Sequence, residues 1–281
     1  MNILDALILG ILQGITEFLP ISSSGHLVLA EGFMNLPVED LLAFDVAVHF
    51  GTLLSIFIFF RKDFYNLIVS FFRIIKTYFL QIKNRKKLQT IKHDEKTAKD
   101  GTLILGLIIA TIPAVIAGLL FADFLEESLR SHTAVASMMI LTAIYFLIAE
   151  KIGSKRKLKT FGLKAMMIIG TAQAFALAPG ISRSGTTIAT GISLGMDRTE
   201  AARFSFLLGS IAISAATLLS LYKVTKGDFL LPSADILAIG IGSSFISGLA
   251  AITILMRFLK RHSLSWFSAY LIIAGIILLI M

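Results

Sequence analysis

The sequence predicts an all-α, polytopic membrane protein with about six full spans and two re-entrant broken-helix hairpins, in a single membrane domain over residues 1–281. Composition is the first observation: 56% of the residues are hydrophobic, 16% are charged and the mean hydropathy is +0.84, outside the balance of soluble domains. The second is that several apolar stretches reach the roughly 20 residues that cross about 30 Å of hydrocarbon. The expected spans are residues 41–60, 101–121, 133–149, 200–221, 235–256 and 264–281.

The N-terminal stretch is expected to form the first broken helix. Residues 1–13 contain Asp5 and no basic cluster, so we expect mature protein here and not a cleaved signal peptide. Residues 3–19 are too short and too interrupted for a comfortable span. Pro20 ends this segment, because proline lacks a backbone donor and disfavours helix in the residue before it. The serines that follow suit the start of a short re-entrant helix.

Basic residues gather in the connections between the spans. Residues 61–99 hold eleven Lys and Arg against three acids, and residues 151–164 hold six Lys or Arg and no acid. Both connections are therefore expected on the cytoplasmic side, whereas the acidic connection at residues 122–132 is expected outside. Residues 64–82 are apolar but contain two basic residues one turn apart. This part of the basic segment is expected to lie along the cytoplasmic membrane surface as an amphipathic helix.

Two parts of the chain match at one constant offset, which indicates an internal repeat. In each copy a proline lies between a glutamine and a Ser-Gly pair, although its position differs by one residue. The matching residues, 160 positions apart, are Gly10 and Gly170, Gln13 and Gln173, Ser24 and Ser184, Gly25 and Gly185, and Phe44 and Phe204.

The loop charges place the two copies in opposite orientations. The span at residues 41–60 must run inward, because a basic loop follows it, whereas the span at residues 200–221 follows a basic loop and must run outward. Inverted-topology repeats of this kind place broken helices and a polar site near the bilayer midplane. We expect repeat 1 at about residues 3–121, repeat 2 at about residues 164–257, and a final span at residues 264–281.

The first broken hairpin carries residues suited to catalysis. Gln13 and Glu17 are four residues apart and share a helix face. A carboxylate in an apolar segment is costly unless it is paired, metal-bound or protonated, so Glu17 indicates metal binding or acid–base work, with a structural bond to a hydroxyl as the alternative. His26 follows Ser22 and Ser23 by four and three residues, so its ring is expected to approach either hydroxyl as the base of an activated nucleophile. The alternative is a histidine that only satisfies a carbonyl at a helix end.

The second broken hairpin carries residues suited to an anion. Arg183 lies between Ser182 and Ser184, and a guanidinium in the membrane region requires an anion such as phosphate or carboxylate. Hydroxyls and backbone amides at a helix start add an oxyanion cradle. A structural pair between Arg183 and Glu17 is the alternative, and both interpretations can hold together. The expected substrate-binding residues of the two hairpins are Ser22, Ser24, Gly25, Ser182, Ser184, Gly185 and Thr187.

Two further polar residues lie in the span after the first hairpin. Asp45 and His49 share a helix face, so they are expected to support the site from behind, or else to form a bond between spans. The chain has no cysteine, which excludes disulfides, thiolate catalysis and cysteine-based metal sites. Its net charge of +8 resides in the loops beside the membrane, so no nucleic-acid partner is expected.

Two complete segments of the chain carry a family resemblance. They are Gln13-Gly-Ile-Thr-Glu17-Phe-Leu-Pro20-Ile-Ser-Ser-Ser-Gly-His26 and Ala178-Pro-Gly-Ile-Ser-Arg183-Ser-Gly-Thr-Thr187. Together they resemble the two signatures of the bacterial undecaprenyl-diphosphate phosphatase family, also called bacitracin-resistance proteins. The resemblance covers the whole chain, including Phe44-Asp-Val, Ile112-Pro-Ala and Phe204-Ser-Phe-Leu-Leu. The family carries Glu or Gln at the position of Gln13, so glutamine leaves one fewer anionic oxygen for a metal here.

The resemblance implies an activity and a location. The implied reaction is hydrolysis of undecaprenyl diphosphate to undecaprenyl phosphate and inorganic phosphate, which recycles the lipid carrier for cell-wall synthesis and gives bacitracin resistance. The implied substrate is a polyprenyl diphosphate lipid in the bacterial plasma membrane, at a site open to the outer face. The implied cofactor is a divalent cation, Mg²⁺ or Ca²⁺, that the protein does not cage by itself. A homodimer is compatible with this assignment.

Residue chemistry and resemblance together assign roles. The expected catalytic residues are Glu17, Ser23, His26 and Arg183, with Gln13 and Glu17 toward the metal and Ser23 preferred as the nucleophile. Attack by activated water or by His26 itself stays open. A polyprenyl-phosphate transporter or flippase is the alternative function, because inverted repeats and broken helices also suggest transport. The Ser/His pair beside a phosphate cradle favours the enzyme.

Overall fold

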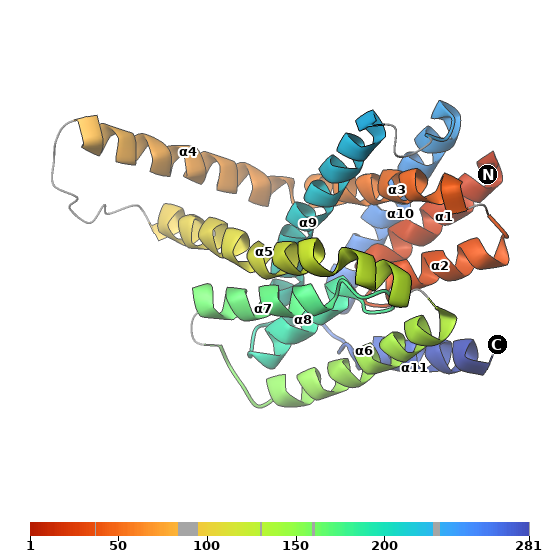
Figure 1. Cartoon of the computed structure of the whole chain (residues 1–281). Coiled ribbons are helices and arrows are strands. Elements are labelled where there is room, and N and C mark those ends of the chain that lie inside the picture. The colour runs from red at the N-terminus through yellow and green to blue at the C-terminus, as the bar shows by residue number, and fades with distance from the viewer. Residues whose placement is uncertain (37, 84–94, 130, 159–160, 227–230, 281) are drawn as a thin grey trace.

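Helices build the whole described part of the chain in the computed structural model, which describes residues 1–36, 38–83, 95–129, 131–158, 161–226 and 231–280 (Figure 1). Within these ranges no strand occurs, so the all-α prediction is confirmed there. In chain order the helices are α1 (Ile3–Phe18), α2 (Ser23–Phe33), α3 (Val38–Phe59), α4 (Arg61–Lys83), α5 (Glu95–Ser128), α6 (His132–Gly153), α7 (Leu163–Phe175), α8 (Arg183–Ser193), α9 (Arg198–Lys226), α10 (Ala234–Phe258) and α11 (Ser265–Ile280).

Four to five helices qualify as membrane spans by length and apolar composition in the described chain, as expected of a multi-pass membrane protein. Four of the expected spans lie in α5, α6, α9 and α10, which each pass alone. The expected span at residues 41–60 lies in α3, which qualifies only together with α4, and the two are bent by 77°. The last expected span corresponds to α11, whose 16 residues are fewer than a crossing usually needs. The count of six therefore stays a prediction.

The helix α4 projects from the body of the molecule beside the first half of α5 (Figure 1). Hydrogen bonds from Ser70 to Asp100 and from Arg73 to Thr97 join the two helices. The outer side of α4 exposes large apolar side chains between its basic residues, which suits the amphipathic surface helix predicted for this segment. Its most exposed aromatic side chains are Tyr65, Phe72 and Phe79.

The internal repeat is visible in the positions at which helices begin. The helices α7, α8 and α9 each begin 160 residues after α1, α2 and α3 respectively. The halves also exchange a helix, because α10 packs against α1 and α3 while α5 packs against α7 and α9. Glycines at matching positions allow this approach: a Cβ on Gly10 would lie 2.7 Å from the carbonyl oxygen of Gly240, and one on Gly170 would lie 2.1 Å from that of Ala110. The halves are built alike and interlock, and their opposite orientation in a membrane stays a prediction.

Both helix breaks lie where the prolines and serines predict them, and they meet at the centre of the molecule. The Ser22 hydroxyl accepts a hydrogen bond from the Gly25 amide at the start of α2, and the Ser182 hydroxyl accepts one from the Gly185 amide at the start of α8. A Cβ on Gly185 would lie 2.9 Å from the Cβ of Pro20, so the second break packs directly against the first.

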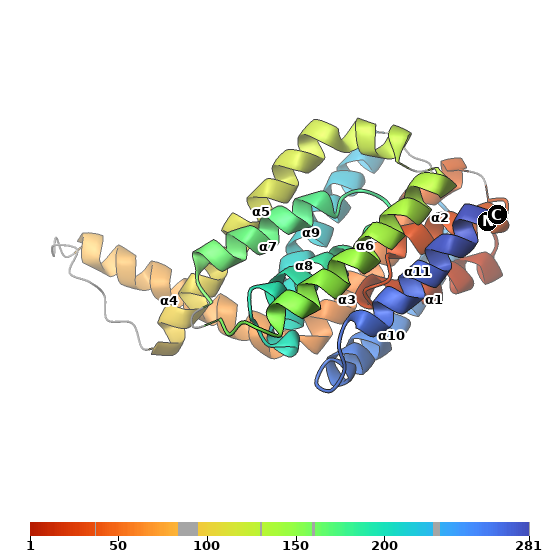
Figure 2. The ribbon, with the colours of Figure 1, turned by 90° about the horizontal axis from the view of Figure 1, so that it is seen from below.

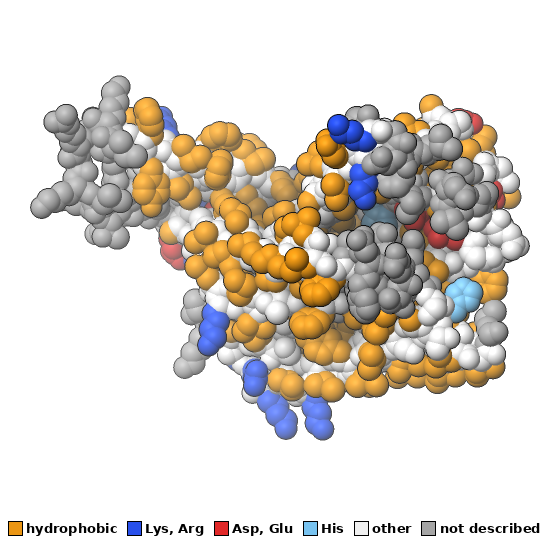
Figure 3. Space-filling model, viewed as in Figure 1, with side chains coloured by type: hydrophobic (Ala, Val, Ile, Leu, Met, Phe, Trp, Pro, Cys, Tyr) orange, Lys and Arg blue, Asp and Glu red, His pale blue; other side chains and the backbone are white. Residues whose placement is uncertain are grey.

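A further layer closes one side of this centre. The helices α6 and α11 lie side by side, and α6 also packs against α2 and α8 (Figure 2). Glu150 of α6 ties this layer to the rest, because its carboxylate accepts hydrogen bonds from the Arg198 guanidinium at 2.6 and 3.0 Å and from the Leu264 amide at 2.7 Å. Hydrophobic side chains are spread widely over the face shown in Figure 3, which suits a surface in contact with lipid.

Candidate active site

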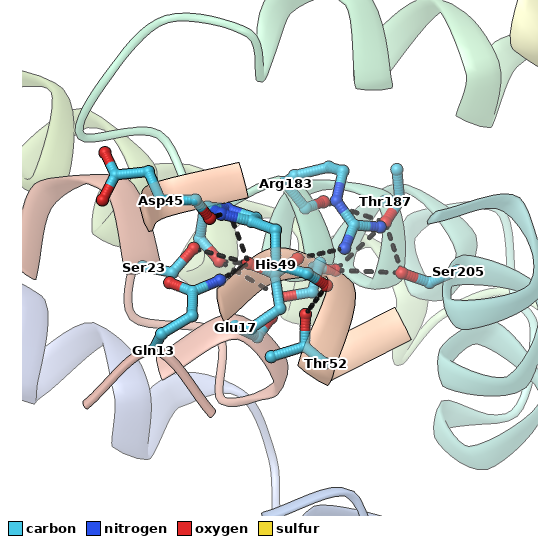
Figure 4. A network of polar contacts seen from close by, with 12 residues as sticks. Gln13, Glu17, Ser23, Asp45, His49, Thr52, Arg183, Thr187 and Ser205 are labelled. Carbon is cyan, nitrogen blue, oxygen red and sulfur yellow. Dashed lines mark hydrogen bonds and ion pairs between the residues drawn. The ribbon is translucent and has the colours of Figure 1, made fainter. Parts of the chain in front are cut away.

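The two helix breaks bring a carboxylate and a guanidinium into contact. Glu17 lies in the last turn of α1, and Arg183 is the first residue of α8. Nη2 of Arg183 donates to Oε1 of Glu17 at 2.6 Å, and the two side chains are only 16% and 6% exposed (Figure 4). This is the pair that the sequence offered as the alternative to a phosphate-bound arginine. A buried ion pair needs additional hydrogen bonds to offset the loss of water, and its neighbours supply them.

The second carboxylate oxygen of Glu17 contacts three further polar side chains of the site. Oγ of Ser23 donates to Oε2 at 2.7 Å, and Nε2 of Gln13 donates to it at 3.1 Å. Nε2 of His49 lies 3.7 Å from the same oxygen, while its Nδ1 donates to the Asp45 carbonyl at 2.7 Å. The Asp45 carboxylate points away from Glu17 in Figure 4. His49 therefore contacts the centre of the site directly, whereas Asp45 holds the His49 ring through its backbone.

Arg183 has a second donor group that no atom of the described residues satisfies. Its Nη1 is buried and has no hydrogen-bond partner among the described residues. Gly209 of α9 makes the space for it, because a Cβ at that position would lie 1.7 Å from Nη1. Sequence reasoning missed Gly209, although the repeat contained the signal: it lies 160 positions after His49. The position that carries the His49 side chain in the first half therefore carries a glycine in the second, where the Arg183 guanidinium needs the space.

The serines around Arg183 divide into those that face the site and those that shape it. Oγ of Ser184 donates to the Glu17 carbonyl at 3.1 Å, and the Ser182 hydroxyl caps α8. Oγ1 of Thr187 lies 2.5 Å from Oγ of Ser205 and is fully buried, so Thr187 supports the cradle from behind instead of facing it. Ser205 was not anticipated from the sequence.

The expected residues of the first break divide in the same way. Ser24 lines the cavity of the site together with Ser23. Ser22 has a left-handed backbone φ of 73°, which is uncommon for a residue with a side chain, and its hydroxyl is 3.3 Å from the Gly25 amide that it caps. A Cβ on Gly25 would lie 3.2 Å from Val135, so glycine allows α6 to approach. Ser22 and Gly25 thus form the turn that presents Ser23.

His26 differs from its expected placement, because its ring contacts neither serine hydroxyl. Nδ1 lies 2.8 Å from the Ser22 carbonyl oxygen, and Nε2 lies 2.6 Å from the hydroxyl of Tyr270 in α11. A carbonyl can only accept, so Nδ1 carries the proton and Nε2 accepts from Tyr270. The physical reason is that the Ser22 hydroxyl already caps the helix and the Ser23 hydroxyl already donates to Glu17. No sequence pattern links His26 to Tyr270.

A cavity of about 410 Å³ gives access to this network between the two breaks, α3 and α9. A stripe of α9 lines its far wall from Ala212 to Lys223, so Lys223 adds a second positive charge at the outer end. Sequence reasoning missed Lys223, whose only signal is its helical spacing from Ser220. The expected site residues that line the cavity are Glu17, Ser23, Ser24, Asp45, His49, Ser182, Arg183 and Ser184.

The side chains at the site fit a cation only in part. The described residues contain no cluster of three or more His, Cys, Asp or Glu that could hold a metal ion. Glu17 offers a carboxylate, and Oε1 of Gln13 is buried without a hydrogen-bond partner in the part of the chain that the structure describes. These two oxygens suit a Mg²⁺ or Ca²⁺ ion that takes its remaining ligands from water and substrate phosphate.

The chain is similar to known proteins over nearly its whole length. Residues 6–277 match the family model described as "Bacitracin resistance protein BacA". The chain is 40% identical over 274 residues to an undecaprenyl-diphosphatase of Thermodesulfovibrio yellowstonii, covering 96% of this chain and 93% of that protein. It is 39% identical over 282 residues to an undecaprenyl-diphosphatase of Methanosphaera stadtmanae, covering 100% and 98% of the two chains. The chain therefore belongs to the bacitracin resistance protein BacA family.

Proposed function

We propose that this protein is an integral membrane phosphatase that hydrolyses undecaprenyl diphosphate to undecaprenyl phosphate and inorganic phosphate. Family membership supports the reaction, which returns the lipid carrier to cell-wall synthesis and confers bacitracin resistance. The observation that carries the proposal is Arg183, which lines a cavity beside serines and whose buried Nη1 donor has no partner among the described residues. A buried unpaired donor requires an explanation, and a phosphate oxygen provides one.

Phosphate binding would redistribute the contacts of Arg183. The guanidinium holds Glu17 through Nη2, and a diphosphate in the cavity would offer it oxygens at both nitrogens. The hydroxyls of Ser182 and Ser184 and the amides at the start of α8 add donors for the equatorial oxygens of the transition state. Glu17 is then released from its ion pair, and its carboxylate still accepts the hydrogen bond from the Ser23 hydroxyl.

Ser23 is the nucleophile that the geometry favours, with Glu17 as its base. Its hydroxyl donates to the carboxylate at 2.7 Å, so the proton can pass to Glu17 as Oγ attacks the terminal phosphorus. The bond from that phosphorus to the bridging oxygen breaks, and undecaprenyl phosphate leaves. Water then releases the phosphate from Ser23, and the hydroxyl regains a proton. His26 is not in contact with Ser23, so a role as base requires its ring to leave Tyr270, while His49 already lies beside Glu17.

A divalent cation is part of the proposal. Mg²⁺ or Ca²⁺ would be held by Glu17 and Gln13 together with the substrate, and it would neutralise charge on the diphosphate. The protein's own contribution is to keep the Gln13 amide and the Glu17 carboxylate adjacent, 3.1 Å apart, in a buried position.

The site is proposed to open to the outer face of the plasma membrane. The support is the distribution of charge: the basic connections before α5 and after α6 belong on the cytoplasmic side, which places the starts of α3 and α10 outside. With that topology the two halves run in opposite directions through the membrane. The homodimer that the sequence allows stays a prediction.

The deciding experiment is phosphate release from undecaprenyl diphosphate by purified protein in detergent, with and without EDTA. We expect release that EDTA suppresses, and loss of at least about a thousandfold in Arg183→Ala, which removes the anion contact. Arg156→Ala is the matched control, because Arg156 is an exposed loop arginine that donates a hydrogen bond to the Ser193 carbonyl, away from the site. Wild-type protein that released no phosphate would refute the proposal.

Lipid translocation is the second candidate function. It is favoured by another cavity, of about 970 Å³, that lies at the opposite end of α9 and is lined by Glu200, Arg203 and Leu207. A transporter with interlocked halves needs openings at both ends of one pathway. Movement of a labelled polyprenyl phosphate across liposomes, measured in the Arg183→Ala variant and in wild type, would separate translocation from hydrolysis.

A further inference from the structure

A second, almost purely apolar groove lies next to the candidate active site. It has a volume of about 270 Å³ and runs between α3, α9 and α10. The groove exists because α9 and α10 both pack against α3 but hardly against each other. Its lining residues are Ala43, Val46, Ala47, Phe50, Thr217, Ser220, Leu221, Val224, Leu231, Leu237 and Ile241.

The groove is continuous with the cavity that holds Glu17 and Arg183. Val46, Thr217 and Ser220 line both, so one turn of α3 and one of α9 form the boundary between them. At this boundary the polar groups end, and beyond it the lining is aliphatic or aromatic. The far end opens at Leu221 and Leu231, whose side chains are 55% and 57% exposed. A ligand with a charged head and an apolar tail would match a polar cavity that continues into an apolar groove.

We propose that this groove binds the first isoprene units of the substrate's polyprenyl chain. The proposal rests on the proposed phosphatase function, since the diphosphate must occupy the adjoining cavity. Small-molecule pockets usually have volumes of about 300–1,000 Å³, so this groove accommodates only the chain segment next to the diphosphate. The rest of the chain would leave the groove past the exposed side chains of Leu221 and Leu231. Only a short part of the polyprenyl chain is therefore recognised, by residues of α3, α9 and α10 and the connection before α10.

A rival cavity on the other side of the site is less suited to such a chain. It measures about 530 Å³ and lies between α6, α7 and α8. It shares only Ile181 with the site cavity, and the hydroxyl of Tyr145 bonds there to Thr190 at 2.7 Å. The hydroxyls of Thr142, Thr171 and Thr190 already hydrogen-bond within the protein, so they do not exclude an apolar chain. The cavity is less suited because one residue alone among the lining residues joins it to the site cavity. The threonines that line it are Thr142, Thr171, Thr186 and Thr190.

The experiment fills each space with a large side chain and varies the length of the substrate. Ala47→Trp and Leu237→Trp obstruct the proposed groove from α3 and from α10, while Ala172→Trp obstructs the rival cavity from α7. None of the three residues lines the cavity with Glu17 and Arg183. Phosphate release is measured with a C5 and a C15 isoprenyl diphosphate in detergent. The C5 substrate has too short a chain to extend far into the groove, so its hydrolysis also reports that each variant is folded.

The expected result is a change in chain preference. Wild type should prefer the C15 substrate, and both groove variants should lose at least about tenfold in kcat/KM for it while staying within about twofold on the C5 substrate. Ala172→Trp should keep the wild-type preference. A loss in Ala172→Trp alone would assign the chain to the rival cavity. Unchanged preference in both groove variants, or equal losses on both substrates, would overturn the proposal and indicate that ordinary membrane lipid fills the groove. Absence of hydrolysis in wild type would instead refute the phosphatase function.

Discussion

The identity of the base is decided at the level of single side chains. Ser23 donates to Glu17 at 2.7 Å, whereas the two ring nitrogens of His26 lie beside Ser22 and Tyr270. We predict that Glu17→Gln lowers kcat by about a hundredfold to ten-thousandfold, the range for loss of a general base. His26→Gln should lower it by less than about tenfold. Phosphate release by the two variants is the measurement, and equal losses in both would return His26 to the role of base.

Gly209 gives a second prediction at this scale. A methyl group at this position would lie 1.7 Å from Nη1 of Arg183, so Gly209→Ala must displace the guanidinium from the cavity. We expect kcat/KM to fall at least about tenfold while the protein stays folded, because the displaced group is the end of a flexible side chain. Gly242→Ala is the control, since nothing lies within 4 Å of a Cβ there. Kinetics and thermal unfolding of both variants in detergent distinguish a local displacement from general destabilisation.

At the scale of helices, the repeat predicts paired sensitivity at two crossings. Gly10 lies where α1 meets α10, and Gly170 lies where α7 meets α5. In both places an added Cβ would meet a backbone carbonyl, which cannot move aside. Gly10→Ala and Gly170→Ala should each destabilise the protein by about 1–3 kcal/mol, the usual effect of overpacking.

The test of these crossings is thermal unfolding of the purified variants in detergent. Gly242→Ala serves as the control, because a Cβ there would meet no described atom within 4 Å. If only one of the two crossings proved sensitive, the halves would not depend on equivalent helix contacts.

The broken helices were predictable because their causes are local. Pro20 and the capping serines act within a few residues, so the sequence places the start of α2 at Ser23 and of α8 at Arg183. The angle between α3 and α4 could not be predicted from the sequence. Its apolar and basic residues predict an amphipathic helix, but the 77° bend after α3 depends on how α4 packs against α5.

At the scale of the whole molecule, the proposed inverted arrangement makes a prediction about sidedness. The chain has no cysteine, so a single introduced cysteine reports its own location without background. Ser233→Cys, just before α10, should react with a membrane-impermeant maleimide added to intact cells. Ser154→Cys, just after α6, should react only after lysis, because its basic loop is expected inside. Labelling of both positions from the same side would contradict the proposed topology.

The sequence by itself determined the helical class, the broken helices, the repeat, and the residues Glu17, Ser23 and Arg183 that now lie together. Each of these depends on composition, on local backbone preferences or on a pattern that recurs within the chain. Only the tertiary structure decided that Ser23 donates to Glu17, that His26 turns to Tyr270, and that Gly209 makes room for Arg183. These choices depend on which side chains fill a shared space between helices distant in sequence. A local sequence pattern cannot predict that space, because it forms only when the helices pack together.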